Sequence, residues 1–146
     1  MSSPIRQLLA DVVEALAAAE VVDPETNAAI DGDTFKVDYL PRFEVADLKD
    51  LRIVVAPRQN TSTKISRSTR EFEFGVQVAV IQTAAKDSER FAQLLDLTHE
   101  LDEALATATI DGGVWSRSEI SLYDVQALEQ HGAFRSVITA YFTNRS

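Results

Sequence analysis

The fold is decided by residues 70–82, which read REFEFGVQVAVIQ. Apolar side chains occupy every second position of this stretch: Phe72, Phe74, Val76, Val78 and Val80. The positions between them are mostly polar or small: Glu71, Glu73, Gly75, Gln77 and Ala79. Successive side chains of a β-strand point to opposite faces of its sheet. The pattern therefore predicts one long strand in a sheet that has one packed face and one mostly polar face.

Two shorter strands are predicted before this one. Residues 34–40 alternate apolar and polar side chains and are followed by Pro41, and residues 51–56 (LRIVVA) are followed by Pro57. Proline has no N–H to donate to a strand ladder, so we expect both strands to stop there. The next stretch, residues 58–69, has Ile65 as its only hydrophobic residue and is expected to be a long loop.

Helical periodicity appears twice. Residues 4–20 follow a suitable N-cap, Ser3, and residues 88–106 begin at Asp87-Ser88, where either side chain could cap the helix. Apolar residues recur at helical spacing in both segments. Two further strands are expected at 114–123 and 133–143, with turns at Asp23-Pro24, Asp31-Gly32 and 111–113. The connection 124–132 is long enough for a short helical turn.

The predicted order is therefore α-β-β-β-α-β-β. We expect a single α+β domain over residues 1–146, with two amphipathic helices packed on one face of a mainly antiparallel sheet of about five strands. A chain of 146 residues is long enough to bury a self-sufficient core.

Composition excludes several classes of function. The chain has no cysteine, which rules out disulfides and thiolate metal sites and suits a reducing compartment. No apolar run approaches the ~18–20 residues that cross a bilayer, and the first residues do not resemble a secretory signal. The net charge of −9 disfavours nonspecific binding to DNA, which depends on Lys and Arg. We expect no cofactor, no metal and no membrane partner.

The sequence shows no catalytic constellation. His99 lies beside three acidic residues in the second predicted helix, far from His131, and a solvated helix face explains that cluster better than a general base does. Neither histidine has metal-ligand spacing. Asp31-Gly32-Asp33 lacks the later positions of a calcium loop and is interpreted as a turn. Trp115 fits a half-buried strand position, with an interface anchor as the alternative. Phe134, Tyr141 and Phe142 fit core or sheet-face positions.

One segment has an unusual charge. Residues 1–50 hold 11 acidic and 4 basic residues, whereas residues 51–70 hold five basic residues and no acidic one. Four of these bases fall in the predicted loop or at its end: Arg58, Lys64, Arg67 and Arg70. They can be solvated charges that balance nearby acids. They can also contact an acidic partner, a neighbouring subunit or DNA phosphate.

The order of elements and several local patterns resemble the tail terminator (tail completion) proteins of long-tailed bacteriophages. The resemblance rests on the first helix (Ile5–Leu16), the strand Leu51–Ala56, the alternating strand Phe72–Ile81 and the Leu-rich helix that opens at Asp87–Phe91. It continues through Trp115 and Tyr123 to the closing strand Phe134–Tyr141. These features extend over nearly the whole chain but form no compact signature.

The resemblance implies a structural protein of the virion, located in the neck at the top of the tail and assembled in the host cytoplasm. Proteins of that family form homohexameric rings that cap the tail tube, end its polymerisation and offer a docking surface to the head connector or head-closure protein. DNA passes through the lumen without sequence-specific binding. A ring needs two different patches on each subunit. The sheet edge left by the long strand is one candidate, and the basic segment 58–70 is expected at the tube-facing surface or on the lumen wall.

Other functions remain open at this point. The chain could be a different neck or minor tail protein, although such proteins tend to be nearly all-β, or a small non-enzymatic binding or adaptor module of a bacterial cell. An enzyme is the least favoured class. The acidic connection Val21–Asp33 is longer than a helix-to-strand link needs to be, and we interpret it as an added contact surface.

Overall fold

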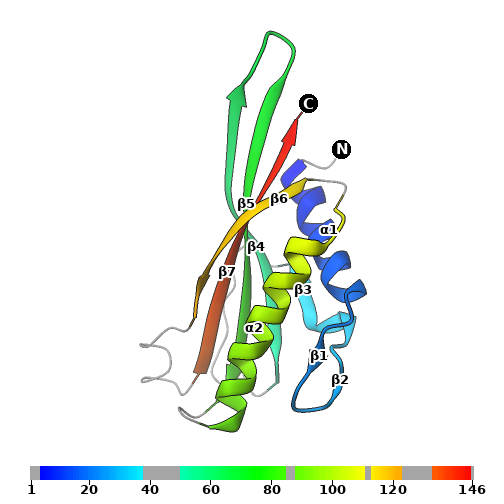
Figure 1. The fold of residues 1–146 in the computed structure, drawn as a ribbon, viewed down its shortest axis with the longest axis vertical. Helices are drawn as coiled ribbons and strands as arrows, with labels where there is room; N and C mark the ends of the chain where they lie inside the picture. Colours follow the sequence, from blue (N-terminus) through cyan, green and yellow to red (C-terminus); the bar gives the residue numbers. More distant parts are fainter. Residues whose placement is uncertain (1–3, 38–49, 85–87, 111–112, 123–132, 146) are drawn as a thin grey trace.

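The structure is a computed structural model that describes residues 4–37, 50–84, 88–110, 113–122 and 133–145. A five-stranded sheet in the order β3-β4-β5-β7-β6 forms one layer, and two helices lie on one of its faces (Figure 1). The helices are α1 (Pro4–Ala18) and α2 (Glu89–Thr107). The strands of this sheet are β3 (Phe35–Val37), β4 (Arg52–Lys64), β5 (Arg70–Thr83), β6 (Val114–Ser121) and β7 (Ala133–Arg145).

The sheet is mainly antiparallel. The pairs β4–β5, β5–β7 and β6–β7 are antiparallel, and only the short β3 runs parallel to its neighbour β4. This architecture confirms the predicted α+β class. A second, two-stranded sheet of β1 (Val22–Asp23) and β2 (Ala28–Ala29) was not predicted, and it is followed by the short 3-10 helix η1 (Gly32–Thr34).

The core lies between the helices and the sheet. The alternation that predicted β5 is confirmed on this face, where Phe74, Val76, Val78 and Val80 are fully buried. They pack in one cluster with leucines from both helices: Leu8, Leu9, Leu16, Leu94, Leu97, Leu101 and Leu105. Burying each leucine contributes about 1.5–3 kcal/mol. Because both helices contact the same face of β5, the expectation that they share one face is confirmed.

The opposite face of β5 is drier than predicted. Ala79 is 7% exposed and Ile81 is 5% exposed, and they form a small second cluster with Ala133. Further along the strand the same face holds the half-buried Glu71 and Glu73. The expectation of a mostly polar face was therefore wrong at the end that holds Ala79 and Ile81, and it fits the end that holds Glu71 and Glu73. The alternating pattern could not distinguish the buried end of this face from the half-buried end, because alanine is compatible with either environment.

The second helix is anchored at both its start and its middle. Ser88 is the N-cap, and its hydroxyl accepts a hydrogen bond from the backbone N–H of Phe91 at 3.1 Å. The buried Thr98 hydroxyl contacts the carbonyl of Leu94 and the hydroxyl of Ser136 on β7, each at 2.8 Å. These bonds satisfy polar groups that would otherwise destabilise the interface between α2 and β7.

Several predicted boundaries shift. Helix α1 ends at Ala18, two residues early, and α2 covers Glu89–Thr107. Strand β7 runs on to Arg145. The predicted Ser3 cap, the end of the strand at 34–40, the turn residues 111–112 and the connection 124–132 lie outside the described residues. No helix in the described part of the chain is long and apolar enough to cross a membrane.

Candidate interaction surface

The largest departure from expectation is at Pro57. Strand β4 does not stop there but continues to Lys64, paired with β5 from Pro57↔Val76 up to Lys64↔Arg70. The register shifts between Pro57 and Gln59, which marks a bulge. Bulges and edge strands are the places where a sheet tolerates proline, because the missing N–H faces away from the ladder. The prediction of a long loop over Arg58–Thr69 was therefore wrong.

The misassigned residues instead form part of a hairpin arm, residues 58–75, whose tip extends beyond the described ends of α1 and β7 (Figure 1). Its turn is short and is closed by two hydrogen bonds, from the N–H groups of Ile65 and Ser66 to the carbonyl of Thr69, at 3.0 and 3.1 Å. On the opposite side of β5, strand β7 pairs as far as Glu71↔Arg145. The arm is thus a hydrogen-bonded extension of the sheet, with β7 supporting its lower part.

All four predicted basic residues lie on this arm. Arg58 is at the bulge, Arg67 is in the turn, and Lys64 and Arg70 face one another across the last strand pair. Arg58 lies six positions before Lys64 along the strand, which places it roughly 20 Å from the tip. The guanidinium of the exposed Arg70 lies over the Phe72 ring, 5.1 Å from its centre. The sequence grouped these charges correctly, but only three of them gather at the tip.

The edges of the sheet that lack a described neighbour lie on the β3–β4 side and at β6, not at β5 as predicted. The long strand β5 lies inside the sheet, with β4 on one side and β7 on the other, so the idea that it leaves an open edge was wrong. Strand β3 pairs only with residues Ile53–Val55, and no described strand lies beside β4 from Ala56 to Lys64. This edge is uncharged between Gln59 and Thr63. The outer edge of β6 is the other one without a described neighbour.

Trp115 packs on the body of the protein. It is half-buried on β6 and contacts the main core cluster, as the sequence favoured over an interface anchor. Its indole Nε1 is buried and has no hydrogen-bond partner among the described residues. The backbone nearby is tight, because a Cβ added at Gly113 would lie 3.0 Å from the Cβ of Phe142. Phe134 and Phe142 are fully buried and Tyr141 is half-buried, so all three occupy the predicted core or sheet-face positions.

The acidic connection after α1 is tied to the body by an ion pair that sequence reasoning missed. Arg90 on α2 donates two hydrogen bonds to the carboxylate of Asp23, at 2.6 and 3.0 Å, and lies 2.8 Å from Glu25. Gln82 also accepts from Arg90. Burial alone would raise the pKa of Asp23, but the hydrogen bonds from Arg90 and the Glu25 N–H, with the positive charge of Arg90, hold it below its usual value.

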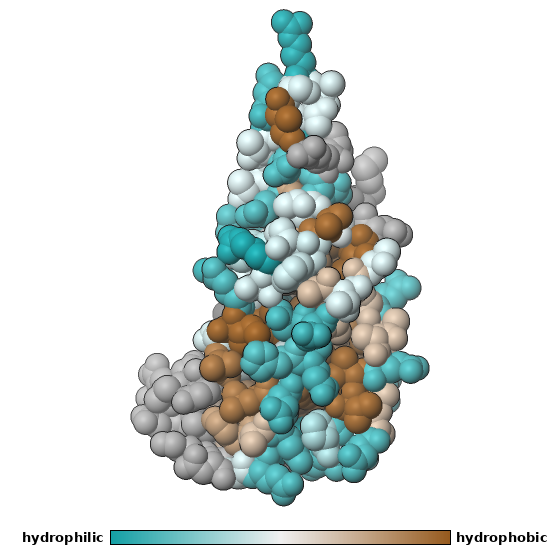
Figure 2. Space-filling view, in the orientation of Figure 1, coloured by the Kyte–Doolittle hydropathy of each residue, from teal (hydrophilic) through white to brown (hydrophobic). Residues whose placement is uncertain are grey.

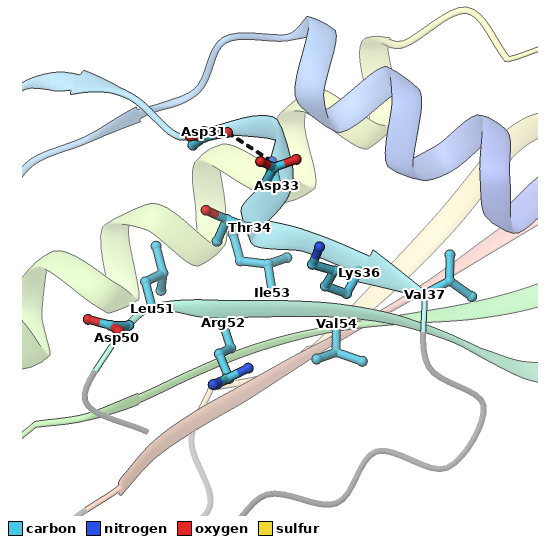
Figure 3. Close-up of a pocket in the computed structure, with 10 residues that line it drawn as sticks. All are labelled: Asp31, Asp33, Thr34, Lys36, Val37, Asp50, Leu51, Arg52, Ile53 and Val54. Atoms are coloured by element: carbon cyan, nitrogen blue, oxygen red, sulfur yellow. Dashed lines mark hydrogen bonds between the residues drawn. The ribbon is translucent and has the colours of Figure 1, made fainter. Parts of the chain in front are cut away.

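A hollow of about 380 Å³ lies where β3 and β4 begin (Figure 3). Its carboxylates are Asp31, Asp33 and Asp50, and its cations are Lys36 and Arg52. The predicted turn at Asp31-Gly32 is η1, capped by Asp31, whose carboxylate accepts from the Asp33 N–H at 3.0 Å. Charges of both signs line this hollow, and the carboxylate of Asp31 is already hydrogen-bonded to the backbone.

The histidines do not contribute to a described site. His99 is exposed on α2, and His131 lies outside the described residues. Among the residues that the structure describes, no three His, Asp or Glu side chains gather closely enough to hold a metal ion. Among the described surface features, we therefore take the arm as the candidate interaction surface.

Comparison with known proteins gives a match in structure alone. No protein-family model and no curated protein matches this sequence. Solved structures do match, among them a chain from the "Virion of native gene transfer agent (GTA) particle". The two chains align over 100% of each, with a TM-score of 0.60 and 16% sequence identity. At this identity the likeness establishes a shared fold over the full length.

Proposed function

We propose that this chain is a structural subunit of a phage-like virion that forms a ring at the top of the tail tube. In this role it ends tube polymerisation, as the tail terminator resemblance implies, and gives the head connector a surface to dock on. The observation that carries the proposal is the fold shared over the whole chain with a protein of a virion particle. Residues 1–146 act in this proposal as one domain whose work is contact with other proteins rather than catalysis.

The shape of the molecule supports assembly. A ring of identical subunits needs two different surfaces that meet head-to-tail and close after a fixed number of copies. The arm provides a protruding surface that ends in hydrophilic side chains, and the helix-covered body provides a broad one (Figure 2). Subunits related by rotation can therefore overlap arm against body.

The charge distribution suits a passage for DNA. The chain carries a net charge of −9, and phosphate binding depends on Lys and Arg. A lumen lined by the acidic body would repel phosphate and let DNA slide without being held. The basic arm is then used against acidic protein surface. Its position at the tube-facing surface or on the lumen wall belongs to this proposal.

The test is assembly on tail tubes. Light scattering of the purified protein should give the mass of six subunits, either alone or after addition of preformed tubes. Tube protein that polymerises in its presence should stop growing, with the ring visible at one end by electron microscopy. A stable dimer that ignores tube ends would contradict the proposal.

A further inference from the structure

The tip of the arm carries an exposed apolar residue between cations. Ile65 is 49% exposed and belongs to neither hydrophobic cluster of the described residues. Lys64 precedes it, Arg67 follows two residues later, and Arg70 faces Lys64 across the strand pair. The backbone N–H groups of Ile65 and of the next residue, Ser66, both donate to the carbonyl of Thr69 and close the turn. The tip thus presents one exposed apolar side chain among three cations.

A groove on the body has the complementary character. It is a shallow hollow of about 210 Å³ between the outer side of α1 and the residues that follow α2. Apolar surface comes from Ala15, Ala18 and Ile110, and two carboxylates border it: those of Asp11 and Glu14. Asp11 accepts a hydrogen bond from Gln7 at 3.0 Å, and neither carboxylate forms a salt bridge with a described residue.

We propose that the arm tip of one subunit docks in this α1 groove of the next copy around the ring, with Ile65 on the apolar surface and Lys64 and Arg67 against Glu14 and Asp11. The inference rests on the proposed ring and names the two surfaces that meet in it. The tip extends beyond the described ends of α1 and β7, away from the body, so it can reach a neighbouring molecule rather than its own α1 (Figure 1).

Charge favours a second copy as the occupant of the groove. Subunits with a net charge of −9 repel one another, so a ring must bring surfaces of opposite sign together. The arm has four bases and no acid between residues 58 and 70, and the groove has two carboxylates. Exposed ion pairs are individually weak, and their main effect is to select the partner surface and its orientation. The apolar contact of Ile65 then adds stability once the surfaces meet.

A charge exchange between two variants tests the contact. The arm variant carries Lys64→Glu and Arg67→Glu, and the groove variant carries Asp11→Lys and Glu14→Lys. Each variant alone places like charges at every contact and should remain monomeric where the wild type forms rings. Mixed in equal amounts, the two should restore rings of alternating subunits, since each arm then meets a groove of opposite charge. Light scattering and native mass spectrometry give the mass and composition.

A matched control separates the groove from overall charge. Asp96→Lys with Glu100→Lys makes the same change in net charge on the exposed side of α2, away from the groove, and should leave ring formation intact. Circular dichroism should show that all variants are folded. Ile65→Ser leaves charge unchanged and should weaken association roughly tenfold at each contact, from the lost apolar burial.

The outcomes are distinct. Restored rings in the mixture, with each variant monomeric alone, support the contact. Rings from either variant alone, failure of the mixture, or equal loss in the α2 control overturn it. If the wild type still caps tail tubes in those cases, the proposed function stands and only the docking site is wrong. A wild type that neither associates nor caps tubes overturns the proposed function, and the contact with it.

Discussion

The body and the arm are built from the same two strands, yet they use side chains in opposite ways. In the body, Ile53 and Val55 of β4 and Val78 of β5 are fully buried beneath the helices. In the arm, every described side chain of β4 from Arg58 to Lys64 is exposed. Backbone pairing continues across both regions, so hydrogen bonds hold the strand geometry while burial changes completely. The body thus carries the stability of the fold, and the β4 side and tip of the arm offer exposed side chains for contact.

The comparison predicts the largest effect for a charge placed in the body. Val78→Asp puts an unpaired carboxylate in the core beneath the helices and should destabilise the protein by about 4 kcal/mol or more, enough to abolish soluble expression. Thr61→Asp on the arm is the matched change and should express normally. Soluble, folded Val78→Asp protein would show that the assigned faces of β5 are reversed.

An intermediate effect is expected where the β1–β2 hairpin meets the body. The side chains of Asp23 and Arg90 are only 10% and 15% exposed. Asp23→Asn keeps the shape but removes the charge that Arg90 faces, and should lower the free energy of unfolding by about 1–3 kcal/mol at neutral pH. Urea denaturation measures this loss. Equal stability of the two proteins at neutral pH would mean that the ion pair contributes nothing to the hairpin contact.

The same substitution predicts a pH dependence with a definite sign. Because the pKa of Asp23 is lowered from 3.8 in the folded protein, its contribution is fully present above that value. It is lost as the pH falls below 3.8 and through the lowered pKa. The stability difference between wild type and Asp23→Asn should therefore shrink over this acid range. A difference that stays constant there would exclude the carboxylate charge as its cause.

The smallest effect on folding is expected in the arm. Changing Arg58, Lys64, Arg67 and Arg70 together to Gln removes exposed charges, each worth under about 0.5 kcal/mol. The contact between Arg70 and the Phe72 ring is one of the interactions lost. Thermal unfolding should change little, while ring formation and tube capping are lost. Normal capping by this variant would remove the arm charges from the proposed function. A large drop in melting temperature would instead make the arm part of the folding core.

Sequence alone predicted the regions where one physical signal dominates. Alternation in residues 70–82 located β5 and its buried face, and the cap signal Asp87-Ser88 located the start of α2. The prediction from sequence was wrong at Pro57, because proline does not end a strand where a bulge lies at a free edge of the sheet. The polar run Gln59–Thr63 looked like a loop because it has no hydrophobic pattern. It is a strand because β5 offers it a continuous ladder.

Of the candidate site, the sequence predicted the group of basic residues but not their arrangement in space. The four bases could be grouped from composition, but their distribution between tip and base depends on the register of β4 with β5. The groove joins α1 to residues 109 and 110, which are far apart in the chain, so local spacing could not reveal it. The same holds for Asp23 and Arg90, which are 67 residues apart.

By itself, the sequence determined the α+β class, the buried faces of the long strand and the helices, and the acidic body with one basic segment. These follow from periodicity and composition, which act over a few neighbouring residues. Only the tertiary structure decided that the basic segment is a projecting hairpin, which edges of the sheet lack a described neighbour, and where the hollow beside α1 lies. Those features come from strand pairing and packing between distant segments, which no local pattern encodes.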